Sequence, residues 1–229
     1  MEIIVDSLLE GSARATGSVV IIDVFRAFTT AAVALANGAA RVIMVGSVHE
    51  AVALRQAGIG QVCMGEVDGK APDVFDFGNS PHAVSTANLA GKTIVQRTSA
   101  GTQGIVTARH ASRMFAGALV TARATARALL ADNPDRISLV AMGKNGVART
   151  DEDELCALHL RNLLEGRPGD PEATRRAILA GGEAPRFARP EGRDSHPGDL
   201  EIALDIDRYD FAVAVTIEDG HPVARMRRD

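Results

Sequence analysis

Residues 19–30 read Val-Val-Ile-Ile-Asp-Val-Phe-Arg-Ala-Phe-Thr-Thr. The first four are apolar and β-branched, as in a buried strand, and Asp23 ends the run. Arg26, Thr29 and Thr30 follow within seven residues. In open α/β sheets, ligands bind beyond the carboxyl ends of strands, where helix amino termini attract anions. The stretch therefore predicts a strand, a turn suited to phosphate and a helix; the alternative is a buried strand followed by an ordinary capped helix.

Outward from this stretch, short β-branched runs alternate with Ala-rich stretches, which predicts an α/β fold. The expected strands lie at residues 19–23, 40–46, 61–65, 93–96, 113–116 and 137–142. The expected helices lie at residues 27–36, 48–57, 101–110, 121–131, 152–164 and 171–179. Asn37-Gly38 and Gly58 are typical helix ends, Ser47 with Glu50 has the spacing of a capping box, and Asp170-Pro171 is typical of a helix start.

Residues 67–85 and 181–198 are rich in Gly and Pro. We interpret the first stretch as a functional loop because of its length, and the second as a surface excursion. Beyond it, residues 202–206 and 211–217 alternate or run apolar, and Asp219-Gly220 offers a turn into residues 222–226. These segments predict a small antiparallel addition to the sheet. No domain boundary is visible, so we expect a single domain over residues 1–229.

The composition excludes several classes of protein. The chain has 229 residues, of which 46% are hydrophobic, and a net charge of −4 with no basic stripe, so no nucleic-acid partner is expected. No apolar run is long enough to span a membrane, and the amino terminus lacks a signal peptide. We therefore expect no membrane partner and a cytoplasmic location. Cys63 and Cys156 stand far apart, which indicates neither a disulfide framework nor a cysteine zinc site.

Glu66 directly follows the predicted strand at residues 61–65, as Asp23 follows the first strand. A lone Glu there is more often a solvated loop residue than a ligand. If the two strands are neighbours, however, the pair suits Mg²⁺, which takes one or two carboxylates and leaves sites for water and phosphate oxygens. Further along, Asn79 and Ser80 lie in Gly-Asn-Ser-Pro and could present an amide and a hydroxyl to a ligand; an ordinary turn is the alternative.

Arg97-Thr98-Ser99-Ala100-Gly101-Thr102 follows a predicted strand at the point where a helix begins. Its guanidinium, its hydroxyls and the helix amino terminus could bind one anion together. Arg97, Thr98, Ser99, Gly101 and Thr102 are therefore candidate substrate-binding residues, although a helix cap with an exposed Arg remains the alternative. Neither a Walker A loop nor a Gly-x-Gly-x-x-Gly motif is present, so neither ATP nor NAD is implied.

Four consecutive acids, residues 151–154, open the predicted helix after Thr150. The helix dipole favours acids at this position whatever their function, so most of them are expected to face water. We expect Glu152 and Asp153 to turn inward, where they could complete a metal shell or accept a proton. Lys144, just upstream, is a candidate for binding a further anionic group.

The ordered set of motifs resembles the 2-phosphosulfolactate phosphatase family, also called the ComB family. The resemblance runs from Ile21-Ile22-Asp23-Val24-Phe25-Arg26-Ala27 through Asn37-Gly38-Ala39, Gly65-Glu66, Phe77-Gly78-Asn79-Ser80-Pro81 and the Thr98–Thr102 turn to Glu152-Asp153-x-Leu155-Cys156-Ala157. This chain departs from the family in having Phe25, where members often have Leu, and Ala100, where they often have Asn. Pattern and resemblance together predict a three-layer α/β/α fold with a mixed, largely parallel sheet.

The resemblance implies a Mg²⁺-dependent phosphatase that converts 2-phospho-3-sulfolactate to 3-sulfolactate and phosphate, on the route to coenzyme M. Asp23 and Glu66 would hold Mg²⁺. Arg26 and Arg97 would bind phosphoryl oxygens, and Glu152 or Asp153 would orient the attacking water. A phospho-enzyme route through Asp23 ranks second, because residue 25 is Phe and the Asp-x-Asp pair of haloacid dehalogenase-like phosphatases is missing.

Carboxylate and sulfonate groups on such a substrate would need further partners, for which Lys144, Thr29, Thr30 and Ser80 are equivalent candidates. Two other functions stay open. One is a phosphatase for a different small phospho-acid, and the other is a non-catalytic sensor of an anionic metabolite. A homodimer is the default expectation for an enzyme of this kind.

Overall fold

The computed structural model describes residues 1–187 and 194–228. The strands of this part of the chain are β1 (Glu2–Ser7), β2 (Gly17–Ile22), β3 (Arg41–Met44), β4 (Val62–Gly65), β5 (Thr93–Arg97), β6 (Ala111–Gly117), β7 (Arg136–Ala141), β8 (Ala212–Glu218) and β9 (His221–Arg227). Its helices are α1 (Leu8–Arg14), α2 (Ala27–Ala36), α3 (Val48–Gln56), α4 (Pro81–Ser85), α5 (Gly101–Thr107), η1 (Leu119–Thr121), α6 (Ala122–Ala131), α7 (Asp151–Leu164), α8 (Pro171–Leu179), η2 (Ala184–Phe187) and α9 (Pro197–Ala203).

The strands and helices predicted between Val19 and Leu179 are all present, with small shifts at their ends. The largest shift is at α5, which ends at Thr107 and not at His110. The predicted end signals of α2 and α8 are confirmed, because Gly38 has a φ of +91° and the Asp170 side chain accepts the Ala173 N–H. β1 and α1 add to the predicted elements.

The strands form one mixed sheet within the described residues, in the order β1-β7-β2-β6-β8-β9-β3-β5-β4. β1, β7, β2 and β6 pair in parallel, as do β3, β5 and β4. Between these two groups, β6–β8, β8–β9 and β9–β3 are antiparallel pairs. Because three antiparallel pairings separate them, the two parallel groups run in opposite directions.

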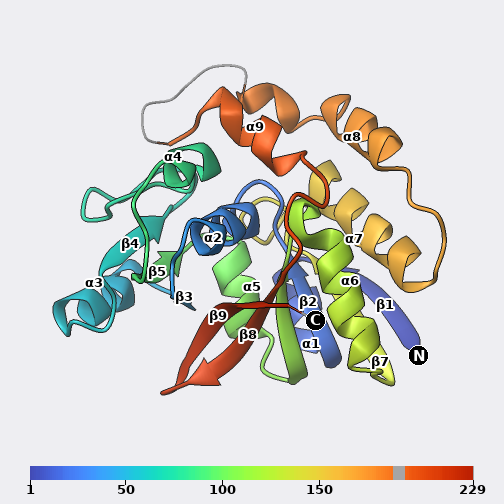
Figure 1. The fold of residues 1–229 in the computed structure, drawn as a ribbon, viewed down its shortest axis with the longest axis horizontal. Coiled ribbons are helices and arrows are strands. Elements are labelled where there is room, and N and C mark those ends of the chain that lie inside the picture. The colour runs from blue at the N-terminus through green and yellow to red at the C-terminus, as the bar shows by residue number, and fades with distance from the viewer. Residues whose placement is uncertain (188–193, 229) are drawn as a thin grey trace.

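The carboxyl-terminal segment forms an antiparallel hairpin in the sheet, as predicted, and this hairpin lies in the interior of the strand order. β8 pairs with β6 and β9 pairs with β3, and the hairpin thus joins the two parallel groups (Figure 1). Residues 202–206 form no strand, because α9 begins with Pro197 at its first position and extends to Ala203. Asp219 and Gly220 both have positive φ, as expected for the predicted tight turn.

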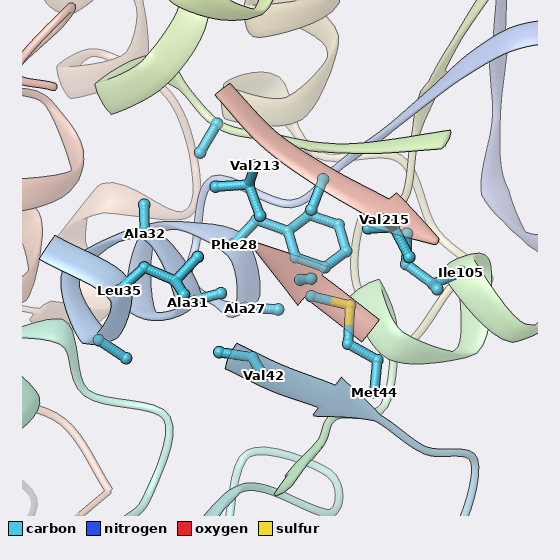
Figure 2. Close-up of a cluster of buried hydrophobic side chains, with 14 of the residues drawn as sticks. Ala27, Phe28, Ala31, Ala32, Leu35, Val42, Met44, Ile105, Val213 and Val215 are labelled. Atoms are coloured by element: carbon cyan, nitrogen blue, oxygen red, sulfur yellow. The ribbon is translucent and has the colours of Figure 1, made fainter. Parts of the chain in front are cut away.

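Helices cover both faces of the sheet, which confirms the three-layer α/β/α fold. Alternate residues of β2 point to opposite faces, so Val19 and Ile21 join the core under α2, while Val20 and Ile22 join the core under α6 and α7. A third cluster lies under α3. Figure 2 shows Phe28 of α2 in one cluster with side chains from three other elements: Met44 of β3, Ile105 of α5, and Val213 and Val215 of β8.

α2 packs on one face of the sheet against strands of both parallel groups. Nine of its residues, Ala27 through Leu35, are buried, so it is apolar on all sides rather than amphipathic. The carboxyl ends of β2 and β5 meet at its amino terminus, although the two strands run in opposite directions. There Asp23, directly after β2, accepts the N–H groups of Ala27 in α2 and of Gly101, which follows β5. Among the described helices, none is both long and apolar enough to cross a membrane.

Candidate active site

A cavity of about 310 Å³ lies at the amino terminus of α2. Its walls carry acidic, basic and amide side chains together. The acids are Asp23, Glu66, Asp68, Glu152 and Asp194; the cations are Arg26, Lys70, Lys144 and Arg186; and the amides are Asn79 and Asn145. Six of these residues, Asp23, Arg26, Glu66, Asn79, Lys144 and Glu152, belong to the motifs singled out in the sequence. The cavity is therefore the candidate active site.

Asp23 directly follows β2, is buried and lines the cavity. Its Oδ1 accepts the Ala27 N–H at 2.9 Å and its Oδ2 accepts the Gly101 N–H at 3.0 Å. Burial raises the pKa of Asp23 to about 6, although these N–H donors act in the opposite direction. Asp23 therefore ties the start of α2 to the start of α5 and titrates closer to neutrality than an ordinary aspartate.

Glu66 reaches the same cavity from the end of β4, although β2 and β4 are not neighbouring strands. β4 is an edge strand, and β6, β8, β9, β3 and β5 separate it from β2. Both acids line one cavity nevertheless. Glu66 Oε2 accepts the Gly69 N–H at 2.6 Å, and Oε1 accepts the Ser99 N–H. Gly65 is required here, because a Cβ at this residue would lie 1.8 Å from the Arg97 carbonyl oxygen.

The turn from Arg97 to Thr102 directs its donors at protein groups. The N–H groups of Ser99 and Gly101 bind Glu66 and Asp23, as above, and the Thr102 N–H donates to Thr98 Oγ1 at 3.0 Å. Arg97 Nη1 donates to the Glu66 carbonyl at 2.7 Å and to Ser99 Oγ at 3.1 Å. Of this turn, Ala100 is the residue that lines the cavity among those described. The turn thus holds the two carboxylates in place.

The two hydroxyls of α2 and that of Ser80 are also used internally. Thr29 Oγ1 donates to the Val24 carbonyl and Thr30 Oγ1 to the Asn79 carbonyl, and both threonines are fully buried. Ser80 caps α4 by accepting the Ala83 N–H. Asn79, next to it, does line the cavity, and its buried Oδ1 has no hydrogen-bond partner among the described residues. Of these four, Asn79 is the one available to a ligand.

The first turn of α7 supplies the predicted inward-facing acids. Glu152 and Asp153 are buried, whereas Asp151 and Glu154 are not, which confirms the predicted division. Asp153 accepts the Val24 N–H at 2.7 Å and the Gly143 N–H at 2.8 Å, and burial raises its pKa well above the usual range. It thus ties α7 to the turn after Asp23.

Glu152 is the acid that lines the cavity from α7. Its buried Oε2 has no hydrogen-bond partner in the described part of the chain. Burial raises its pKa to about 7, so near neutral pH the side chain exchanges a proton readily. Its position and pKa suit a general acid or base.

Arg26 follows Asp23 in a turn that contains a cis peptide bond between Phe25 and Arg26. The guanidinium is buried and lines the cavity, and its Nη1 forms an ion pair of 2.7 Å with Asp199 Oδ2. Asp199 lies in the first turn of α9, in a region where no site residue was predicted. Its signal in the sequence is the helix start His196-Pro197, with an acid at the third helical position.

The segment after residue 181 also contributes cavity residues that sequence reasoning missed. The sequence predicted only a surface excursion here, and the structure adds that Arg186, Phe187, Asp194 and Ser195 line the cavity. Arg186 donates to the Phe25 carbonyl at 2.9 Å and lies over the Phe187 ring. Residues 188–193 lie outside the described residues. Of the four equivalent candidates for further anionic groups, Lys144 is the one that lines the cavity.

Fold and site together define an α/β protein with buried carboxylates and arginines around a small cavity at the ends of its strands. Within this class, the chain belongs to the 2-phosphosulpholactate phosphatase family, whose model matches residues 4–182. The resemblance seen in the motifs is thereby confirmed.

Individual relatives agree with the family match. A Bacillus subtilis protein named probable 2-phosphosulfolactate phosphatase is 32% identical over 64% of this chain and 64% of its own length. A Prochlorococcus marinus protein of the same name is 38% identical over 66% of this chain and 63% of its own length. A Deinococcus radiodurans protein, again of that name, is 32% identical over 82% of this chain and 80% of its own length. The matches to the first two thus span less than two thirds of those relatives.

Proposed function

We propose that the protein is a phosphoric monoester hydrolase that acts on a small phosphorylated acid, with 2-phospho-3-sulfolactate as the first candidate substrate. The family match supports the reaction class. The observation that carries the proposal is the meeting of Arg26, Arg186 and Lys144 with Asp23 and Glu152 in one small cavity. Cations favour a substrate with several anionic groups, and acids of raised pKa provide proton transfer.

In this proposal Arg26 binds phosphoryl oxygens, while Arg186 and Lys144 contact the carboxylate and sulfonate. Guanidinium groups suit planar or tetrahedral oxyanions because they donate several hydrogen bonds in a fixed geometry. Glu152 orients a water molecule toward phosphorus and accepts its proton as the P–O ester bond breaks. The ester oxygen leaves with a proton from solvent or from an acid of the cavity. Hydrolysis then gives the free hydroxy acid and inorganic phosphate.

We further propose that Mg²⁺ assists the reaction. Asn79 Oδ1 and Glu152 Oε2 are buried oxygens without hydrogen-bond partners in the described part of the chain, and a hard cation satisfies such oxygens. Asp23 and Glu66, with Asn79 Oδ1 in the same cavity, would supply oxygen donors of the kind that Mg²⁺ prefers, while Glu152 stays available to the attacking water. The described residues contain no group of three or more His, Cys, Asp or Glu side chains arranged to hold a metal, so water and phosphate oxygens would complete the shell. Bound Mg²⁺ would neutralise charge on the phosphoryl oxygens.

The test is phosphate release from 2-phospho-3-sulfolactate and from a panel of small phosphomonoesters, with Mg²⁺ and with EDTA. We expect turnover that needs Mg²⁺ and falls at least about a hundredfold in Asp23→Asn. Asp170→Ala, which removes only the cap of α8, is the matched control and should retain wild-type turnover. Calorimetric titration of Mg²⁺ into the ligand-free protein gives a readout independent of activity, and Asn79→Ala should weaken that binding.

Each outcome distinguishes the candidate functions. Best turnover of another phospho-acid would keep the reaction and change the substrate. Binding of 2-phospho-3-sulfolactate without turnover of any ester, in folded wild-type protein, would favour a sensor of an anionic metabolite. Wild-type turnover in EDTA would remove Mg²⁺ from the proposal.

A further inference from the structure

We infer that Asp199 is a positioning residue for Arg26, so that the first turn of α9 belongs to the active site. The inference rests on the proposed function, because it assigns Arg26 to phosphate. Asp199 lies beyond residue 182, where the family match ends. Its role is therefore argued from its contacts alone.

Asp199 is fully buried and accepts four hydrogen bonds. Oδ2 accepts Arg26 Nη1 at 2.7 Å and the His196 N–H at 3.0 Å. Oδ1 accepts Ser80 Oγ at 2.6 Å and the His82 N–H at 3.0 Å. A buried carboxylate needs hydrogen bonds to replace those it would make with water. For Asp199 these bonds come from three separate segments of the chain, which contain Arg26, Ser80 with His82, and His196. Asp199 thus has a single defined position.

That position determines where the Arg26 guanidinium lies. Arg26 is itself buried, so its charge needs a nearby carboxylate, and among the described residues Asp199 is its ion-pair partner. A guanidinium has five N–H donors. Pairing through Nη1 holds the group at the cavity wall and leaves donors for a phosphoryl oxygen. Because Asp199 does not line the cavity, it acts on the substrate through Arg26.

The same contacts give the first turn of α9 a fixed place. His196 stacks on His82 with ring centroids 3.8 Å apart, and a Cβ at Gly198 would collide with the His82 ring. α9 therefore packs directly on α4, the helix that follows Asn79. A purely structural role for Asp199 in this packing is the alternative that an experiment must separate from positioning of Arg26.

The experiment is a double-mutant cycle with Asp199→Asn, Arg26→Gln and the double variant, in the full-length protein with Mg²⁺. The probe is inorganic phosphate, whose dissociation constant is measured by calorimetry alongside the melting temperature. If Asp199 acts through Arg26, Asp199→Asn should weaken phosphate binding roughly tenfold to a hundredfold, since small misplacement of a binding group has effects of this size. The double variant should bind phosphate as weakly as Arg26→Gln alone.

Two further variants keep the test decisive. Asp132→Asn removes a carboxylate that pairs with Arg113 and Arg227 away from the cavity, so it should lower the melting temperature and leave phosphate binding unchanged. If Asp199→Asn does not fold, Asp199→Glu carries the comparison, because it keeps the charge and displaces the carboxylate by one methylene. It should bind phosphate more weakly than wild type.

Additive losses in the double variant, or wild-type phosphate binding by a folded Asp199 variant, would overturn the positioning role and leave the proposed function standing. If wild-type protein neither binds phosphate nor hydrolyses any ester, the proposed function fails, and the inference fails with it.

Discussion

At the residue scale, the carboxylates of the site fall into two kinds. Asp23, Glu66 and Asp153 each accept at least two backbone N–H groups, which hold them in place. Glu152 has a buried oxygen without such a partner and carries a pKa raised to about 7. The first kind organises the turns around the cavity, whereas Glu152 is free to exchange a proton or to bind a ligand.

Burial of Glu152 and Asp23 makes stability depend on pH. Their pKa values are raised to about 7 and about 6 in the folded protein, above 4.5 and 3.8 in the unfolded chain. Between those limits the folded state binds more protons, so stability falls as pH rises. We expect the ligand-free protein to lose stability from pH 5 to pH 8, and Glu152→Gln to lose less. Urea unfolding across this pH range measures the effect.

Burial also raises the pKa of Asp153, which acts in the same direction as Glu152 and Asp23. Acids with a lowered pKa do not obscure this result. Arg225 lowers the pKa of Glu218 to about 2, and the Arg227 side chain lowers that of Asp132. Their contribution to stability is present above the unfolded pKa and is lost as pH falls through the acid range, well below pH 5. A wild-type stability that rises between pH 5 and pH 8, or an unchanged slope in Glu152→Gln, would contradict the assignment.

At the scale of elements, the end of β4 determines whether Glu66 reaches the cavity. Gly65 has a φ of +132°, and its Cα faces the Arg97 carbonyl oxygen of β5. No side chain fits there without moving one of the two strands. Gly65 therefore allows the backbones of β4 and β5 to approach closely, and the next residue, Glu66, places its carboxylate at the cavity.

We expect Gly65→Ala to lower the free energy of unfolding by about 3 kcal/mol, because it adds both an unfavourable φ and a collision with backbone. It should also abolish Mg²⁺-dependent turnover through displacement of Glu66. Chemical denaturation and the phosphate-release assay measure the two effects. Gly58→Ala is the matched control: it also has a positive φ, but nothing lies within 4 Å of its Cβ position. Equal losses in the two variants would show that φ alone matters.

At the scale of the whole molecule, the β8–β9 hairpin connects two parallel groups of strands that run in opposite directions. Val213 and Val215 of the hairpin pack with Phe28 of α2, as Figure 2 shows, so the hairpin also closes the core around that helix. The site lies at the amino terminus of this helix. Its assembly therefore depends on the last segment of the chain.

A chain that ends at Arg208 should consequently lose cooperative folding, because both parallel groups would expose unpaired strand edges and apolar surface. Circular dichroism during thermal unfolding and resistance to proteolysis measure this. The untruncated chain under the same conditions is the control and should show one cooperative transition. A cooperative transition in the shorter chain would mean that the two strand groups hold together without the hairpin.

Local signals in the sequence predicted much of this structure. The β-branched run before Asp23, the caps of α2 and α8, and the inward turn of Glu152 and Asp153 depend on residues close together in the chain, where propensity and hydrogen bonding act directly. The place of the hairpin, the pairing of Arg26 with Asp199 and the contribution of Arg186 to the cavity were not predictable. Each depends on contacts between segments that lie far apart in the sequence.

The sequence by itself determined the fold class, the family and the chemical character of the site, because periodicity and motif order are local properties of the chain. Only the tertiary structure decided which of the motif residues face the cavity. It directs the Thr29 and Thr30 hydroxyls and the N–H groups of Ser99 and Gly101 at protein acceptors, and it leaves Asn79 and Glu152 with open oxygens. Buried polar groups pair where a partner is near, and the folding of distant segments onto one another determines which groups have one.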